Sequence, residues 1–112
     1  MIETTLLEYL GENLSVPVCM EAPAQVTGYV LLDKTGSSRQ NHIITSTFAV
    51  QSYGASLLEA AQLNEEVEEA MAGLLELDEI TKVDLETDYN FTNTTTKQYR
   101  WQAVYHITHY RV

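Results

Sequence analysis

Two motifs in the second half of the sequence contain residue types that bind metal ions, but neither has the spacing of a metal site. His106 and His109 are three residues apart in a segment with strand composition. Side chains three apart on a strand point to opposite faces, so these imidazoles do not converge on one ion. Acidic residues alternate between positions 84 and 90, but a calcium loop needs Gly and Glu where this chain has Tyr89 and Thr95. We therefore expect no metal ion and no cofactor.

Nucleophilic side chains also lack the neighbours that catalysis requires. Cys19 is the only cysteine, and it follows the apolar segment 16–18 with no histidine beside it. This setting predicts a buried, unreactive thiol and excludes an intrachain disulfide. No serine lies in a Gly-x-Ser-x-Gly elbow, and the sequence has no glycine-rich phosphate loop. We therefore predict that the chain is not an enzyme.

The composition of the 112-residue chain excludes several classes of protein. Its length corresponds to a single domain, residues 1–112, and 45% hydrophobic residues are too many for a disordered tail. The formal net charge is −10 and the six basic residues are scattered, so we expect no specific nucleic-acid binding. The acidic first residues do not fit a signal peptide, and no apolar run reaches the length of a membrane span. We expect a protein of a reducing cytosol with no membrane partner.

In the first half of the chain, hydrophobic periodicity predicts a helix followed by three strands. Apolar residues at helical spacing between 2 and 14 define one face of a helix. A proline favours an extended segment at 16–20, and residues 28–33 form a short apolar strand. A further strand at 42–53 alternates apolar and polar side chains. Because residues 33–41 contain no apolar side chain, we expect a long polar loop there that projects as a mobile hairpin tip.

The second half of the chain predicts a helix and two more strands. Ser56 and Glu59 fit a capping box at the start of a helix that runs to about Leu77. Two segments of alternating side chains, 83–91 and 99–110, form a second hairpin around a polar loop. The predicted fold class is α+β. It has two layers, a mostly antiparallel β-sheet with two helices packed on one face, and the order α-β-β-β-α-β-β.

Acidic residues are concentrated in one part of the sequence. Positions 59–88 hold eleven of the sixteen acids and one base, Lys82. On the predicted helix the acids lie largely on the outer face, and on the predicted strand alternation places them on a single polar face. A solvated surface that keeps the protein soluble accounts for this pattern without any further function. The candidate acidic surface comprises Glu65, Glu66, Glu68, Glu69, Asp84, Glu86 and Asp88.

The order of these elements and the composition of their strands are also informative. An amphipathic first helix is followed by PVCMEAP at 17–23, a strand TSTFAVQSY at 45–53, a helix start SLLEAA at 56–61, and a late strand YRWQAVYHITHY at 99–110. In this arrangement the chain resembles the tail-completion and tail-terminator family of long-tailed bacteriophages. The resemblance spans nearly the whole chain and rests on element order and strand composition, without a catalytic signature.

The resemblance implies a structural protein of a phage or prophage rather than an enzyme. Members of this family assemble as a ring, commonly a hexamer, at the head-proximal end of the tail tube. The ring stops tube polymerisation, contacts the tail tube protein and the head connector protein, and lets DNA pass through its centre. The expected location is therefore the tail or neck of the virion, after assembly in the cytoplasm of the bacterial host.

The same resemblance gives roles to two polar segments and to the acidic surface. The polar loops at 33–41 and 92–97 are candidate docking loops that order when a partner binds. The candidate docking residues are Lys34, Thr35, Gly36, Ser37, Ser38, Arg39, Thr94, Thr95 and Lys97. Under this hypothesis either the helix acids or the strand acids of the candidate acidic surface line the lumen, where they repel DNA phosphates and let DNA slide without sticking.

Three other functions remain open from the sequence. The first is a neighbouring phage role, either head closure or a minor capsid adaptor. The second is a non-phage adaptor whose acidic surface binds a basic protein, as a nucleic-acid mimic does. The third is a small enzyme whose pocket the sequence does not reveal. A mimic binds basic proteins with a steep salt dependence, whereas a tail ring self-associates or caps tubes.

Overall fold

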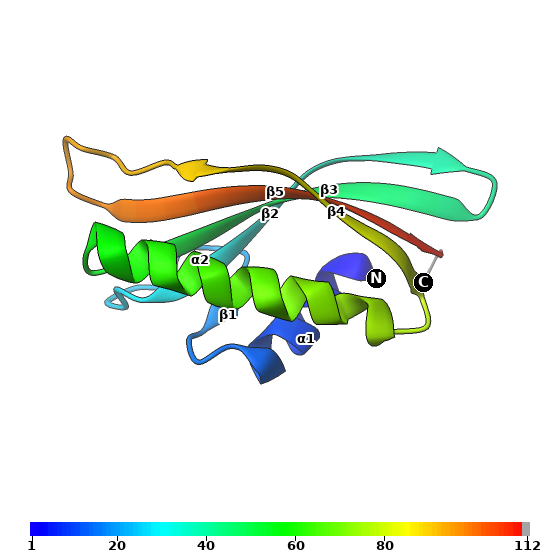
Figure 1. The fold of residues 1–112 in the computed structure, drawn as a ribbon, viewed down its shortest axis with the longest axis horizontal. Helices are drawn as coiled ribbons and strands as arrows, with labels where there is room; N and C mark the ends of the chain where they lie inside the picture. The colour runs from blue at the N-terminus through cyan, green and yellow to red at the C-terminus, as the bar shows by residue number, and fades with distance from the viewer. Residues whose placement is uncertain (111–112) are drawn as a thin grey trace.

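The chain folds into one five-stranded sheet with both helices on one of its faces (Figure 1). The structure is a computed structural model and describes residues 1–110. The elements in chain order are α1 (Ile2–Asn13), β1 (Val18–Cys19), β2 (Tyr29–Gln40), β3 (Ile43–Gly54), α2 (Leu57–Ala72), the 3-10 helix η1 (Gly73–Glu76), β4 (Ile80–Asn90) and β5 (Tyr99–Tyr110). The strand order is β1-β2-β3-β5-β4, and all neighbours are antiparallel except β1 and β2. The predicted α+β class and element order are confirmed.

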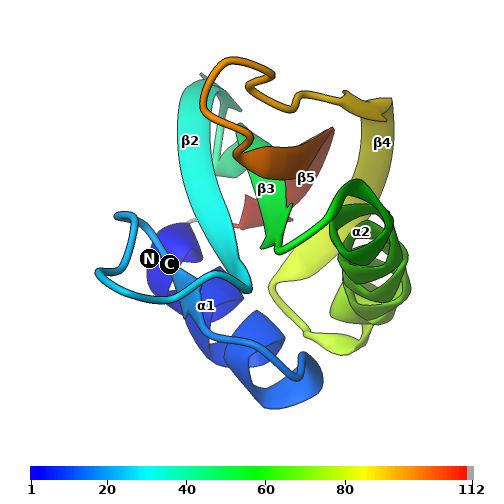
Figure 2. The same cartoon turned by 90° about the vertical axis from the view of Figure 1, so that its left-hand side faces the viewer.

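The hydrophobic core lies between the helices and the sheet face that they cover, called here the helix-bearing face. In Figure 2, α1 lies on the β2 side of this face and α2 on the β4 side. Alternate residues of β2, β3 and β5 point into the core, as the period of two requires. The central buried residues are Leu6, Leu10, Val30, Leu32, Phe48, Val50, Val67, Met71, Tyr105 and Ile107. The opposite face carries Thr45, Thr47, Gln51, Gln102 and His106, and we call it the helix-free face.

The start of α2 is fixed by the capping box that the sequence predicts. The hydroxyl of Ser56 accepts a hydrogen bond from the backbone N–H of Glu59 at 3.2 Å. The Glu59 carboxylate in turn accepts one from the backbone N–H of Ala55 at 2.9 Å. These contacts satisfy N–H groups that have no partner within the helix. At its other end α2 continues into η1, and the helical region ends at Glu76, as predicted.

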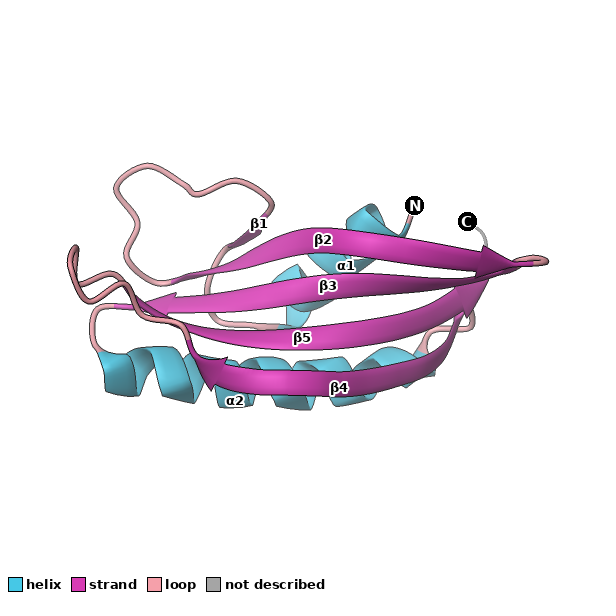
Figure 3. Ribbon diagram, turned by 90° about the horizontal axis from the view of Figure 1, so that it is seen from above, coloured by secondary structure: helices cyan, strands magenta, loops and turns pink. Residues whose placement is uncertain are grey.

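Residues 33–40 of the polar segment belong to a strand, so the prediction of a long loop at 33–41 was wrong. Strand β2 continues through it and pairs with β3 as far as Gln40 opposite Ile43 (Figure 3). The turn is only two residues, and Asn41 takes the left-handed conformation with φ of 59°. Polar side chains suffice here because this part of the hairpin extends beyond the helices. The backbone hydrogen bonds to β3 hold the strand without a core contact. The candidate docking residues 34–39 are therefore strand residues.

The alternation predicted for β4 was wrong in its second half. The register against β5 shifts between Leu85 and Thr87, so Glu86 is the extra residue of a β-bulge. Before the bulge, Asp84 pairs with His106 on the helix-free face; after it, Asp88 pairs with Ala103 on the helix-bearing face. A one-residue insertion reverses the facing of every later side chain. Asp84 and Asp88 consequently point to opposite sides of the sheet.

The polar loop between β4 and β5 is present as predicted and lies at one end of the molecule. Asn93 bridges to Gln98, and the Asn93 side chain accepts hydrogen bonds from the backbone N–H groups of Thr95 and Thr96. Lys97 has a positive φ of 55°. The β2–β3 turn lies at the opposite end of the long axis, which extends over 44 Å (Figure 1). The two ends of the sheet therefore carry different turns.

Candidate functional site

The seven residues of the candidate acidic surface do not form one face. Asp84 and Glu86 lie on the helix-free face, where Glu86 contacts the imidazole of His106 at 3.1 Å. Glu65 and Glu69 are exposed on α2. The Glu66 carboxylate accepts a hydrogen bond from the Ser15 hydroxyl at 3.1 Å and so holds the segment after α1. The prediction that the strand acids share one face was wrong, because the bulge in β4 places Asp84 and Asp88 on opposite faces of the sheet.

The remaining two acids, Glu68 and Asp88, meet between α2 and the edge strand β4. We call them the acid pair. The Glu68 carboxyl is hydrogen-bonded to that of Asp88. One Asp88 oxygen also accepts hydrogen bonds from the side-chain N–H groups of Asn64, at 2.9 Å, and of Trp101. Asp88 thus receives donors from both a helix and the central sheet.

Glu68 of the acid pair lines an apolar groove between α2, η1 and β4. The groove has a volume of about 290 Å³. Its lining comprises Glu68, Met71, Ala72, Leu75, Val83, Leu85 and Tyr105. Leu75 and Leu85 are exposed on its walls, although Leu75 continues the helical spacing of the buried Val67 and Met71. The 3-10 geometry of η1 accounts for Leu75, because it turns the last residues away from the α-helical stripe.

Two buried polar atoms beside the acid pair have no hydrogen-bond partner within residues 1–110. They are the hydroxyl of Tyr105, whose side chain lines the groove, and the carbonyl oxygen of the Asn64 side chain. Tyr105 is 2% exposed and Asn64 3% exposed. Burial and the neighbouring Glu68 and Asp88 carboxyls raise the pKa of Tyr105. Buried polar atoms without a partner cost stability and mark a place where a polar ligand atom fits.

The acid pair predicts a specific dependence of stability on pH. The hydrogen bond to Asp88, then burial, then the charges of Asp88 and Glu65, raise the pKa of Glu68 from 4.5 to about 7. The folded protein therefore keeps a proton that the unfolded chain releases, so stability falls as the pH rises from 4.5 through 7. We expect Glu68→Gln to remove this loss.

The gain from Glu68→Gln should grow to about 1–2 kcal/mol between pH 5 and pH 8, after allowance for solvent screening at the open groove. Urea unfolding at several pH values measures it. Glu69→Gln changes an exposed neighbour on the same helix and should follow the wild type at every pH. A constant difference between Glu68→Gln and wild type across this range would show that the two carboxyls share no proton.

Both long edges of the sheet are unpaired among the described strands. On one side β4 pairs only with β5. On the other side β1 covers only Val30 and Leu31 of β2, which leaves residues 32–40 without an outer neighbour. We call these the β4 edge and the β2 edge. Such edges are templates for pairing with another strand. Of the candidate docking residues, 34–39 lie on the β2 edge, while Thr94, Thr95 and Lys97 lie in the β4–β5 loop.

The helix-free face is a ladder of polar cross-strand pairs. Thr45 contacts Thr108 at 3.3 Å, and the Gln51 amide donates to the Gln102 side chain at 2.7 Å. Thr47 Oγ1 lies 2.9 Å from a ring nitrogen of His106. No helix or strand of residues 1–110 covers this face (Figure 1). Its polar side chains are therefore held in place by their cross-strand neighbours.

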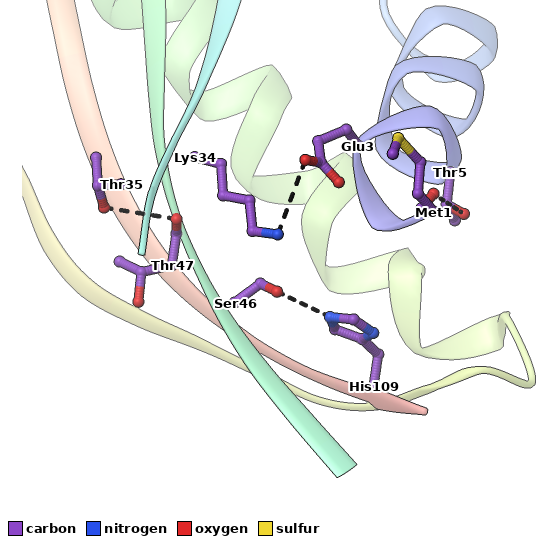
Figure 4. Close-up of polar contacts among 8 residues, drawn as sticks. All are labelled: Met1, Glu3, Thr5, Lys34, Thr35, Ser46, Thr47 and His109. Atoms are coloured by element: carbon purple, nitrogen blue, oxygen red, sulfur yellow. Dashed lines mark hydrogen bonds and ion pairs between the residues drawn. The ribbon is translucent and has the colours of Figure 1, made fainter. Parts of the chain in front are cut away.

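The two histidines and the cysteine that the sequence offered as possible ligands or nucleophiles lie in separate places. His106 lies on the helix-free face, whereas His109 is buried on the other face and lies 2.9 Å from the Ser46 hydroxyl (Figure 4). The predicted opposition of the two imidazoles is confirmed. Burial raises the pKa of the Cys19 thiol, which lies 3.6 Å from the Val30 carbonyl oxygen and is a weak nucleophile. In the described part of the chain no three His, Cys, Asp or Glu residues are grouped to hold a metal ion.

A hollow of about 550 Å³ lies at the β4–β5 end of the sheet. Tyr29, Tyr53 and Tyr99 contribute to its walls together with Lys97 of the loop. Tyr29 and Tyr53 stack with ring centroids 4.4 Å apart. The Arg100 guanidinium donates to the Tyr53 hydroxyl at 3.2 Å. This hollow offers aromatic faces and one lysine for contact with a partner.

The acid pair and its unpartnered neighbours were missed by sequence reasoning, which grouped Asp88 with Asp84. One signal was available. Trp101 and Tyr105 belong to a strand whose aromatic face is buried, and indole N–H groups in such places need an acceptor. A carboxylate on the neighbouring edge strand is the nearest candidate acceptor, and choosing Asp88 for that role requires a bulge in β4.

Comparison with protein-family models and with curated proteins finds no match for this chain. Across residues 1–110, no helix is both long enough and apolar enough to cross a membrane.

Proposed function

We propose that this chain is a structural protein of a phage or prophage that forms a ring at the head-proximal end of the tail. The proposal combines the resemblance in the sequence with one feature of the fold, the two unpaired sheet edges. In this role the ring stops tube growth and joins the tail tube protein to the head connector protein. The proposed assembly is a hexamer in the neck of the virion, and no step of it requires catalysis.

The β2 edge and the β4 edge support self-association because they differ and lie on opposite sides of one sheet. The alternation of antiparallel neighbours makes β2 and β4 of one copy antiparallel. A second copy in the same orientation therefore continues the sheet with antiparallel pairing. A contact between two different surfaces is heterologous, and it generates a closed ring when the rotation between copies closes.

The two ends of the long axis suit the two partners of such a ring. If the sheet axis follows the ring axis, the β4–β5 loop and the β2–β3 turn emerge on opposite rims. One rim then carries Thr94, Thr95 and Lys97, and the other carries Asn41 and His42. Each rim presents a different surface, as a joint between a tube and a connector requires.

The helix-free face is the part of the sheet that we assign to the lumen. In a closed ring the face with the helices needs the larger circumference and lies outside. The lumen then receives Asp84 and Glu86, whereas Glu65 and Glu69 of α2 lie on the outer side. Lys82 lies on the same face, 3.3 Å from Asp84, so the repulsion of DNA phosphates in the lumen rests mainly on Glu86.

Light scattering over a concentration series, with negative-stain imaging of the same fractions, tests the ring. The protein is studied alone and mixed with tubes polymerised from the tail tube protein of the same phage. We expect closed rings, or caps at one end of the tubes. A protein that stays monomeric and does not bind the tubes would overturn the proposal and favour the head-closure or acidic-adaptor functions.

Charge reversal at the proposed lumen tests the lumen assignment independently of ring formation. The double variant Asp84→Lys with Glu86→Lys should slow DNA passage and lower phage titre by at least tenfold, because lysines bind the passing phosphates. The matched control is Glu65→Lys with Glu69→Lys, which makes the same charge change outside the ring. Equal titres for the two double variants would contradict the lumen assignment and leave the ring intact.

A further inference from the structure

We infer that the acid pair is a seat for a lysine of a second copy, and that this lysine is Lys34. The inference rests on the proposed self-association. It adds to it the register in which β2 of one copy runs along β4 of the next. The contact brings the groove beside β4 together with β2, in the part of that strand that the sequence predicted to be a loop.

The groove has the chemistry that a lysine side chain requires. Its walls are aliphatic, with Met71, Leu75, Val83 and Leu85, and suit the methylene groups of a long side chain. Glu68 lines the groove, and beside it lies the Asp88 carboxyl, which accepts a hydrogen bond from the Asn64 side chain at 2.9 Å. An ammonium group satisfies both acids at once.

The unpartnered atoms of the site are an independent indication of the same ligand. The Tyr105 hydroxyl oxygen and the Asn64 carbonyl oxygen are both buried, and neither has a partner within the described residues. An ammonium group has three N–H donors and no acceptor. Two carboxyls and two further oxygens give it enough acceptors, and they would repel an anion. The site therefore selects a cationic group.

Lys34 reaches this side of the sheet from the β2 edge. It pairs with Phe48, whose side chain is in the core, and its ammonium group lies 3.8 Å from Glu3 of α1 (Figure 4). Lys34 therefore points to the helix-bearing face, as Asp88 does on the opposite edge. The 3.8 Å distance is at the limit of an ion pair, and the two side chains are 28% and 21% exposed, so in the proposed contact Lys34 exchanges one carboxylate partner for two.

The bulges of the two edge strands fix the register. In β2 the extra residue is Thr35, between Lys34 and Gly36; β4 has two, Thr81 and Glu86, and of these Glu86 is the one near Asp88. Setting Lys34 opposite Asp88 in an antiparallel pair brings 35–36 opposite 86–87. Both strands have two consecutive residues on the helix-free face at this point, so the irregularities match. The following pair, Ser37 and Leu85, again shares the helix-bearing face.

The same register excludes the other basic residue of the β2 edge. Arg39 falls opposite Val83, five positions along β4 from Asp88, and each position adds about 3.3 Å. Its guanidinium is therefore too far along the groove to contact the acid pair. Arg39 consequently serves as a control with the same charge sign, on the same strand and on the same face.

The test is a charge exchange measured by sedimentation velocity of the full chain, alone and on tail tubes. Lys34→Glu should weaken association at least tenfold, and Arg39→Glu, with the same change in net charge, less than threefold. Combining Lys34→Glu with Glu68→Lys should restore association to within threefold of wild type. Circular dichroism of each variant confirms that the monomer is folded, and Glu68 is accessible enough for lysine to replace it.

Each outcome has a distinct meaning. If Lys34→Glu and Arg39→Glu form rings or caps equally well, Lys34 does not bind the acid pair. This result would leave the proposed ring unaffected. Failure of the charge exchange to restore association, with both variants folded, also overturns the seat. A wild type that forms neither rings nor caps overturns the proposed function and the seat together.

Discussion

Phe48→Ala should destabilise the fold by about 3–5 kcal/mol, the largest effect that we expect from a single substitution. Phe48 is 0% exposed and lies at the middle of β3, where its pairing partners are Lys34 on one side and Tyr105 on the other. Its removal leaves a cavity under the centre of the sheet that the paired strands have little freedom to close. Thermal and urea unfolding measure the loss.

The only other phenylalanine is a matched control. Phe91 is 40% exposed at the end of β4, where it contacts the ring of Tyr89 and the guanidinium of Arg100, the latter at 4.4 Å from the ring centroid. Phe91→Ala should cost about 1 kcal/mol, because it removes surface contacts without opening a cavity. Similar losses for the two variants would mean that the core does not centre on Phe48.

Gly54→Ala should cost about 2–3 kcal/mol, since the junction between β3 and α2 has no room for a side chain. A Cβ at Gly54 meets the backbone nitrogen of Ala60 at 2.7 Å and the Cβ of Glu59 at 2.9 Å. Those atoms belong to the first turn of α2, which the capping box holds in place. The substitution must push the helix away from the sheet, and urea unfolding should record it.

Gly11→Ala gives the opposite result and serves as the control. Gly11 is exposed near the end of α1, and a Cβ there meets nothing within 4 Å. Alanine in a helix is favoured over glycine by about 1 kcal/mol, so this variant should be more stable than wild type. A gain at Gly54 as well would show that α2 is free to move relative to the end of β3.

The elements with a hydrophobic period were predictable from the sequence, and the polar strand was not. The capping box and the apolar stripe of α2 are local signals, and the packing of that helix agrees with them. Residues 34–40 form a strand because β3 offers them backbone partners, a property of the neighbour rather than of their own composition. Composition therefore indicated a loop, and pairing with β3 overrode it.

The candidate site was harder to predict because it depends on one inserted residue. Alternation along 83–91 places Asp84, Glu86 and Asp88 together, and the bulge at Glu86 separates them. Nothing in the local sequence marks Glu86 as the extra residue. Its position is set by Trp101 and Asn64, which hold Asp88 on the helix-bearing face from distant parts of the chain. The acid pair is accordingly a product of tertiary contacts.

The central place of β5 in the sheet has a consequence for how the chain folds. β5 pairs with both β3 and β4, yet residues 55–98 separate it from β3 in sequence. A central pairing of such high contact order is slow to form, on a scale of milliseconds to seconds. Until β5 pairs with β3, the β2–β3 hairpin has no partner along β3 and exposes an apolar stripe. During synthesis this hairpin leaves the ribosome well before β5, so the nascent chain depends on a chaperone or on rapid completion to avoid aggregation.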